Sequence, residues 1–176
     1  MNDDYGVLTA TDTVRIERLL PGPIERLWAY LTEADKRALW LAGGPMGLQP
    51  GGQVELVFRN SGLAKDDIAP PEKYRSESGE HRLHGVVTDC EPPTLLAFTW
   101  GESSAVRFEL TPRGAQVQLV ITHSRLANQG AVLAVSAGWH AHLGILRARL
   151  EGQEPVGFWA THARLEAEYA RRFAAS

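Results

Sequence analysis

The chain has 176 residues, of which 44% are hydrophobic and 22% are charged, and its formal net charge is −3. This composition excludes a disordered chain, and the single cysteine, Cys90, excludes a disulfide scaffold. The weak negative charge argues against nucleic acid or an acidic membrane as a partner. No apolar run approaches the roughly 18 residues typical of a membrane span, and the first residues lack the pattern of a secretory signal. We therefore expect a cytoplasmic protein.

The first predicted elements are one strand and two short helices. Apolar and charged residues alternate over residues 11–18, which indicates a half-buried strand. Apolar residues then recur at spacings of three and four over Ile24–Leu31, the pattern of a helix with one buried face. A second short helix is expected from Thr32 to about Leu41, where Gly43-Gly44-Pro45 must end it.

A series of strands is predicted next. The hydrophobic period switches to two over Gln53–Phe58. Residues 61–79 are polar and rich in turn residues, so we expect a long exposed insertion that is mobile or packs over an entrance. Further strand-like runs cover Glu80–Cys90, Leu95–Trp100, Ala105–Leu110 and Gln116–Ser124. Their short connections favour antiparallel hairpins, since a parallel crossover needs a dozen or more residues.

Two helices complete the predicted order. Val132–Leu150 carries the longest amphipathic pattern, and Gly152 and Pro155 interrupt it before a terminal helix over residues 156–173. An antiparallel sheet with one apolar face needs a cover, and the long helix is the only element long and apolar enough. We therefore predict an α+β fold in which a curved antiparallel sheet wraps around the long helix. The earlier short helices act as lids, residues 1–10 form an N-terminal tail, and residues 11–176 form a single domain.

Several stretches resemble the START-like superfamily, also named SRPBCC, which has the helix-grip fold and includes polyketide aromatase/cyclases. Within it, the chain is most similar to the bacterial relatives of the activator of the heat-shock protein 90 ATPase. The residues that carry the resemblance are Val14–Arg18, Pro23–Trp28, Gly51-Gly52, His84–Val87, Glu91–Pro93, Leu95–Trp100, Leu119–Ser124 and Gly138–His140. The resemblance implies a bacterial protein, a link to stress response and a chaperone as a candidate partner; a homodimer stays open.

Proteins of this fold usually hold apolar ligands between the sheet and the long helix. Strand parity and helix spacing give the candidate lining residues Trp28, Trp40, Phe58, Phe98, Trp100, Phe108, His123, Trp139, Leu143 and Leu146. The alternative is a solid core made of the same side chains. A dry void of about 400 Å³ would cost about 10 kcal/mol, so a lumen is either small or filled.

His123 is the polar residue that we single out, because it shares a strand face with Val117, Leu119 and Ile121. A buried imidazole can orient a ligand or transfer a proton. The alternative is a histidine whose hydrogen bonds are satisfied within the protein, by Thr99 or by a helix residue.

The sequence gives little sign of other chemistry. His81 and His84 should face opposite sides of a strand, and His140 and His142 should diverge on a helix, so we expect no metal site. Cys90 is expected to be a small core residue. No cofactor-binding pattern is present.

Three functions follow as hypotheses. We expect a non-catalytic module that binds a hydrophobic small molecule. The alternatives are an enzyme similar to an aromatase/cyclase that uses the inward-facing His123, and a co-chaperone that stimulates a chaperone ATPase. The catalytic alternative requires further polar groups clustered with His123.

Overall fold

The computed structural model describes residues 4–175, and it has the predicted α+β fold. Seven strands form an antiparallel sheet in the order β1-β2-β7-β6-β5-β4-β3. The strands are β1 (Val7–Ala10), β2 (Thr13–Pro21), β3 (Gln53–Phe58), β4 (His81–Glu91), β5 (Leu95–Trp100), β6 (Ser104–Arg113) and β7 (Gln116–Ser124). Short turns join β4 through β7, as the spacing of the sequence predicts.

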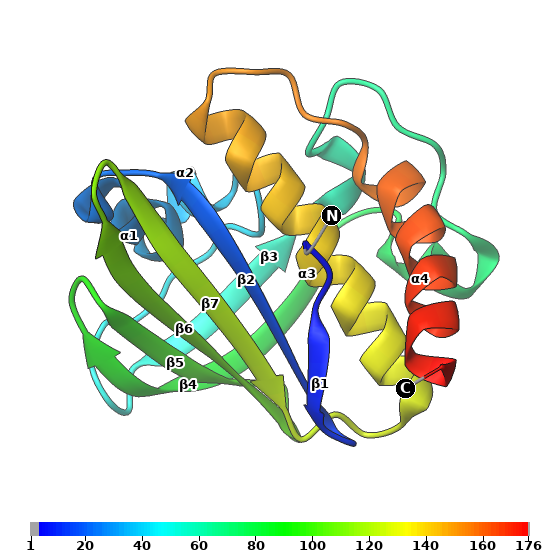
Figure 1. Cartoon of the computed structure of the whole chain (residues 1–176), viewed down its shortest axis with the longest axis horizontal. Helices are drawn as coiled ribbons and strands as arrows, with labels where there is room; N and C mark the ends of the chain where they lie inside the picture. Colours follow the sequence, from blue (N-terminus) through cyan, green and yellow to red (C-terminus); the bar gives the residue numbers. More distant parts are fainter. Residues whose placement is uncertain (1–3, 176) are drawn as a thin grey trace.

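The long helix α3 (Gln129–Leu150) lies across the concave face of the sheet, and α4 (Phe158–Ala174) packs against it on the side away from the sheet (Figure 1). Asn128 starts α3 by accepting a hydrogen bond from the backbone N–H of Ala131 at 2.9 Å. Because the sheet covers one side of α3 and α4 covers another, residues on nearly every side of the helix are buried, including Ala137, Ala141 and Ile145. The helix is more enclosed than an amphipathic pattern alone predicts, because α4 covers its second face.

The lid helices α1 (Ile24–Thr32) and α2 (Ala34–Arg37) follow β2 as expected, but α2 is shorter than the predicted span from Thr32 to Leu41. The reason is Arg37, which is buried. Its guanidinium donates hydrogen bonds to the backbone carbonyls of Leu31, Thr32, Ala42 and Gly44. These bonds hold the chain in a turn after Arg37, where a longer helix would have continued. Burial lowers the pKa of Arg37 to about 10.

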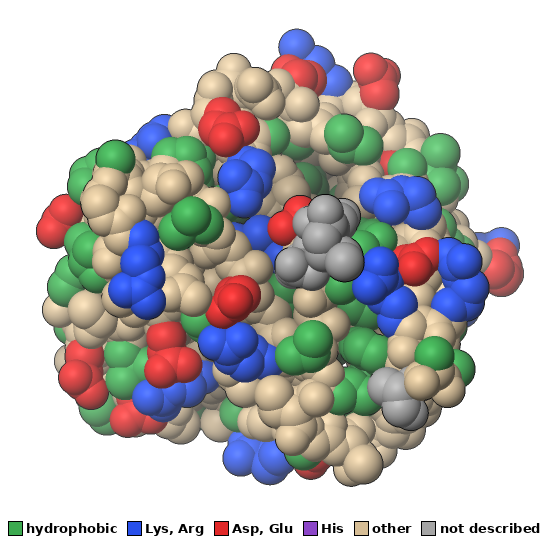
Figure 2. Space-filling model, viewed as in Figure 1, with side chains coloured by type: hydrophobic (Ala, Val, Ile, Leu, Met, Phe, Trp, Pro, Cys, Tyr) green, Lys and Arg blue, Asp and Glu red, His purple; other side chains and the backbone are tan. Residues whose placement is uncertain are grey.

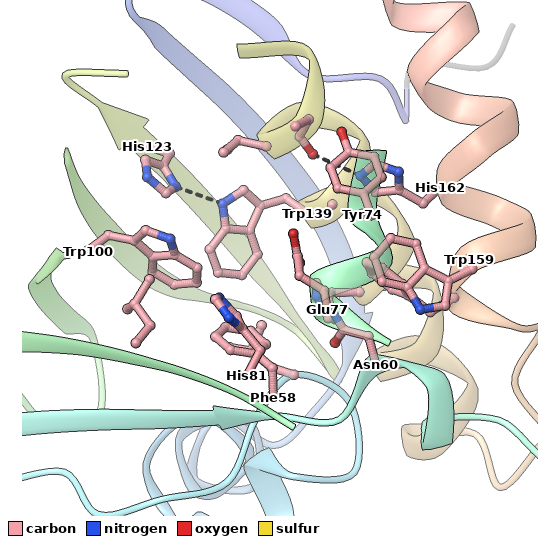
Figure 3. Close-up of a pocket in the computed structure, with 17 residues that line it drawn as sticks. Phe58, Asn60, Tyr74, Glu77, His81, Trp100, His123, Trp139, Trp159 and His162 are labelled. Atoms are coloured by element: carbon pink, nitrogen blue, oxygen red, sulfur yellow. Dashed lines mark hydrogen bonds between the residues drawn. The ribbon is translucent and has the colours of Figure 1, made fainter. Parts of the chain in front are cut away.

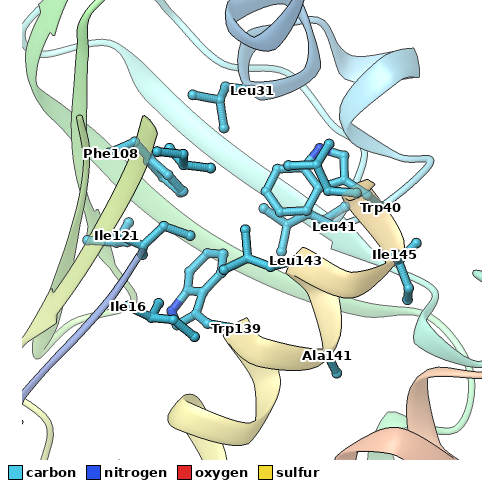
Figure 4. Packing of buried hydrophobic residues seen from close by; sticks show 14 of the residues in the cluster. Ile16, Leu31, Trp40, Leu41, Phe108, Ile121, Trp139, Ala141, Leu143 and Ile145 are labelled. Atoms are coloured by element: carbon cyan, nitrogen blue, oxygen red, sulfur yellow. The ribbon is translucent and has the colours of Figure 1, made fainter. Parts of the chain in front are cut away.

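The core fills the space between the sheet, α3 and the lids. Trp139 and Leu143 point from α3 toward Ile121 and Phe108 on the sheet, while Trp40 closes the lid end (Figure 4). Side chains from α4 join the same buried cluster. Such continuity lets one core stabilise every layer of the molecule.

Two features depart from the expected element order. Residues 1–10 were expected to be a tail, yet Val7–Ala10 form strand β1, which pairs with β2 at the sheet edge. The strand is short and mostly exposed, so it has no buried alternation to reveal it. The insertion contains the 3₁₀ helices η1 (Asn60–Gly62) and η2 (Glu72–Glu77), which pack beside α4 (Figure 1).

The surface has no large region of one charge on the face shown in Figure 2, where acidic and basic side chains are interspersed. Ion pairs at the protein surface include Arg15 with Glu17 and Arg82 with Glu55. Within residues 4–175, none of the helices has the length and hydrophobicity that a membrane crossing requires.

Candidate functional site

A cavity of about 240 Å³ lies where α3 meets the β3–β5 side of the sheet, the insertion and α4 (Figure 3). An engineered apolar cavity of about 150 Å³ holds benzene, so this volume suits a ring with a short substituent or two fused rings. The lining residues are Leu41, Phe58, Asn60, Tyr74, Glu77, His81, Leu83, Trp100, His123, Ala134, Val135, Gly138, Trp139, His142, Phe158, Trp159 and His162.

The walls are mainly aromatic. Trp100 packs edge-on against Trp139 with ring centroids 5.3 Å apart, and against Phe58 at 5.8 Å. On the other side, Tyr74 stacks on Trp159 at 5.5 Å. Rings held in this way offer flat apolar surfaces to a ligand and lose little conformational freedom when it binds.

His123 lies at the back of the cavity and is fully buried, which confirms its predicted inward orientation. Its Nδ1 accepts a hydrogen bond from Trp139 Nε1 at 3.0 Å, so the ring proton must be on Nε2. Nε2 lies 3.0 Å from Ser104 Oγ and donates to it, and the Ser104 hydroxyl donates to the carbonyl oxygen of Trp100 at 3.1 Å. Both ring nitrogens of His123 and the hydroxyl of Ser104 are therefore hydrogen-bonded within the protein.

This arrangement favours the interpretation of His123 as a histidine whose hydrogen bonds are satisfied within the protein. Burial lowers its pKa to about 3, so the ring is neutral near pH 7. A general base needs a free lone pair and a pKa near the working pH, and His123 has neither. The partners are Trp139 of the helix and Ser104, and not Thr99, whose hydroxyl accepts from the backbone N–H of Val86. His123 thus connects helix to sheet.

The insertion forms one wall because polar contacts fasten it to α4. The carboxylate of Asp67 accepts hydrogen bonds from the backbone N–H groups of Trp159 at 2.8 Å and Ala160 at 3.0 Å. The hydroxyl of Tyr74 donates to Glu166 at 2.6 Å, and the indole N–H of Trp159 donates to Ser61 at 3.1 Å. These contacts support the expectation that residues 61–79 pack over an entrance.

Two buried side chains of the wall keep an unpaired polar atom. His162 places Nε2 3.1 Å from the carbonyl oxygen of Ala134, but its Nδ1 has no partner. Asn60, at the start of η1, likewise has an unpaired side-chain oxygen. Most buried polar groups are paired, so these two atoms suggest contacts with a bound molecule.

Glu77 and His81 also line the cavity, and both are only partly buried. Burial raises the pKa of the Glu77 carboxyl, and the nearby His81 opposes that shift. His142, deeper in the wall, donates from Nδ1 to the carbonyl oxygen of Trp40 at 2.8 Å. Its pKa falls to about 4, mainly because of burial.

The predicted lining residues divide into two groups. Phe58, Trp100, His123 and Trp139 lie in the cavity wall. The others, Trp28, Trp40, Phe98, Phe108, Leu143 and Leu146, belong to or pack against the solid core beside it. The inward face that the sequence predicts thus contains both core positions and cavity positions.

Packing of the insertion over an entrance was one of two expectations, but the side chains that the insertion and α4 contribute to the cavity wall were not predicted. The stripe of Phe158 and His162 on the last helix is visible in the sequence, but its spacing does not show that it faces α3. Tyr74, Glu77 and His81 lie in or next to a segment without periodicity. Only the tertiary docking of these segments brings them to the cavity.

The other candidate residues take structural or exposed positions. His84 pairs with Glu55 at the surface, and His140 contacts the hydroxyl of Tyr169 at 2.8 Å. Cys90 is partly buried, and burial raises the pKa of its thiol. Across residues 4–175, no group of three or more His, Cys, Asp or Glu side chains could hold a metal ion.

Comparison with known proteins places the chain in a fold family. The family model "Activator of Hsp90 ATPase homolog 1-like protein" matches residues 21–151. A Bordetella parapertussis protein, solved by NMR, is 46% identical with a TM-score of 0.80, and the match covers 97% of this chain and 91% of that one. No curated protein is similar enough to count as a match.

More distant structures share the fold alone. CalU16 from Micromonospora echinospora is 18% identical with a TM-score of 0.65, over 93% of this chain and 86% of that chain. A conserved Enterococcus faecalis protein is 20% identical with a TM-score of 0.68, over 98% of this chain and 91% of that one.

Proposed function

This chain belongs to the Activator of Hsp90 ATPase homolog 1-like family of the START-like superfamily, and on that premise we propose that it binds a hydrophobic small molecule without transforming it. The binding site is the cavity between α3, the sheet, the insertion and α4. The observation that carries the proposal is a cavity of about 240 Å³ that has an aromatic lining and unpaired buried polar atoms in its wall.

The hydrogen bonds that His123 makes within the protein favour binding over catalysis. An enzyme similar to an aromatase/cyclase would use this inward-facing histidine, but both of its ring nitrogens are engaged by Trp139 and Ser104. A chaperone partner, which the family description suggests, and a homodimer stay predictions.

The proposal is tested by filling the cavity from α3. Gly138 lines the cavity, and a Cβ atom built there meets no atom within 4 Å. We expect Gly138→Leu to place its side chain in the cavity and to abolish binding of 2-naphthylmethanol, measured by isothermal titration calorimetry. Wild-type protein at a hundredfold excess of ligand over Kd should gain about 2.7 kcal/mol of stability, which raises Tm by roughly 5–10 °C.

Gly144→Leu is the matched control, because Gly144 lies on the same helix, is exposed and also has free space around its Cβ position. Both substitutions remove a helix-interior glycine, worth about 1 kcal/mol of helix stability, so they differ only in where the new side chain points. Equal binding by the two variants, or no binding by the wild type, would overturn the proposal.

A further inference from the structure

The polar atoms around the cavity differ in whether the protein already uses them. The indole N–H groups of Trp139 and Trp159 donate to His123 and Ser61, and the Tyr74 hydroxyl donates to Glu166. These donors are therefore not available to a ligand. A ligand has to be recognised by the polar atoms that remain.

The two unpaired buried atoms of the cavity wall, His162 Nδ1 and Asn60 Oδ1, are both acceptors. The carbonyl of Ala134 can only accept, so His162 Nε2 must carry the proton, and Nδ1 keeps a lone pair. His162 is 3% exposed and Asn60 is 6% exposed, so water does not readily satisfy either atom. A buried acceptor without a donor is costly, and a ligand that supplies N–H groups removes that cost.

Glu77 adds a negative charge to the same cavity. It is the only carboxylate among the lining residues, and it makes no ion pair with Lys or Arg within residues 4–175. The neighbouring cations are engaged elsewhere, since Lys73 pairs with Glu166 at 2.9 Å and Arg75 pairs with Glu72. Figure 3 shows the side chain of Glu77 extending between Trp139 and Tyr74, on the same side of the cavity as Asn60 and His162.

We propose that the ligand is an amine with a flat apolar body, whose ammonium group faces Glu77 and whose rings lie against the aromatic wall. This inference rests on the proposed function and specifies the chemical class of the ligand. An ammonium group has three donors and no acceptor, which matches a carboxylate with acceptors nearby. Lys73 already lies over the ring of Tyr74, with Nζ 5.3 Å from the ring centroid, so the additional attraction for a cation has to come from the tryptophan rings of the wall.

The test uses three compounds with one naphthalene body: 2-naphthylmethylamine, 2-naphthylmethanol and 2-naphthoic acid. Their affinities are measured by calorimetry at pH 8, where an unperturbed histidine is neutral. We expect the amine to bind at least about tenfold more tightly than the alcohol, and the acid to bind most weakly. In Glu77→Gln, the ratio between amine and alcohol should fall below about twofold.

Glu72→Gln is the matched control, since Glu72 lies in the same 3₁₀ helix but its side chain is exposed and pairs with Arg75. This variant should keep the wild-type ratio, and circular dichroism should show that both variants are folded. If the alcohol binds and the amine binds no more tightly, the inference fails while the proposed function stands. If none of the three binds, both fail.

Discussion

At the scale of single residues, strand parity predicts orientation but not partners. Alternation along β7 places His123 inward, and the structure confirms this. Its partner Ser104 begins β6, and its partner Trp139 lies on α3, so both depend on the register between elements. Arg37 was missed for the same reason, because its carbonyl partners come together only in the folded turn.

The buried histidines make stability depend on pH. Burial lowers the pKa of His142 to about 4, so the folded protein keeps this ring neutral while the unfolded chain protonates it near pH 6.5. The stabilisation is fully present above pH 6.5 and is lost as the pH falls toward 4. Between pH 7 and pH 5 we expect His142 to lower the free energy of unfolding by about 2 kcal/mol.

This expectation is checked by urea unfolding of His142→Asn at both pH values. The asparagine amide can replace the Nδ1 donor toward the carbonyl of Trp40, but it does not titrate. The variant should lose about 2 kcal/mol of the pH dependence. His84→Asn, at an exposed position that contacts Glu55, should keep it. A pH dependence in His142→Asn equal to that of the wild type would contradict the assignment.

At the scale of elements, periodicity locates most helices and strands, and irregular segments are where it fails. The strands β3 and β5 and the end of α3 lie where the pattern predicts. The insertion has no period, so its contacts were beyond prediction. One signal was present: Gly157 precedes α4 without a side chain that could cap the helix, and Asp67 supplies that cap from far away in the sequence.

Removing this cap should weaken the attachment of the insertion to α4. Asp67→Ala leaves the N–H groups of Trp159 and Ala160 without their acceptor, and we expect a loss of about 1–2 kcal/mol in the free energy of unfolding. Asp66→Ala removes an exposed neighbouring carboxylate and should change stability by less than about 0.5 kcal/mol. Equal urea midpoints for the two variants would show that the cap has no energetic role.

At the scale of the whole molecule, the overall fold could be predicted because a single apolar sheet face requires a single long cover. The cavity could not, because core and cavity positions share one hydrophobic pattern. Phe98 and Trp100 lie on the same strand, yet Trp100 lines the cavity while Phe98 is packed in the core. The difference comes from how α4 and the insertion dock.

We expect the described residues, 4–175, to unfold as one domain. The buried cluster includes Phe158, Trp159 and Tyr169 of α4 together with residues of the sheet and α3. Urea unfolding followed by tryptophan fluorescence and by circular dichroism should therefore give coincident transitions. Trp159→Phe removes the indole on α4, and its fluorescence midpoint should still coincide with its circular dichroism midpoint. An early fluorescence change that only the wild type shows would mean that α4 detaches first.

The hydrogen bonds from Trp139 through His123 and Ser104 to Trp100 also determine how a guest molecule could come and go. They anchor the middle of α3 to the adjacent strands β7, β6 and β5, so the helix and the sheet stay in contact there. The junction of the insertion and α4 is fastened by Asp67 and Tyr74, so we expect a molecule to enter and leave past the partly buried residues Glu77 and His81. Helix α4 lies beyond the segment that the family model matches, residues 21–151. The four residues of this hydrogen-bonded connection lie within that segment, whereas the cavity wall from α4 lies outside it.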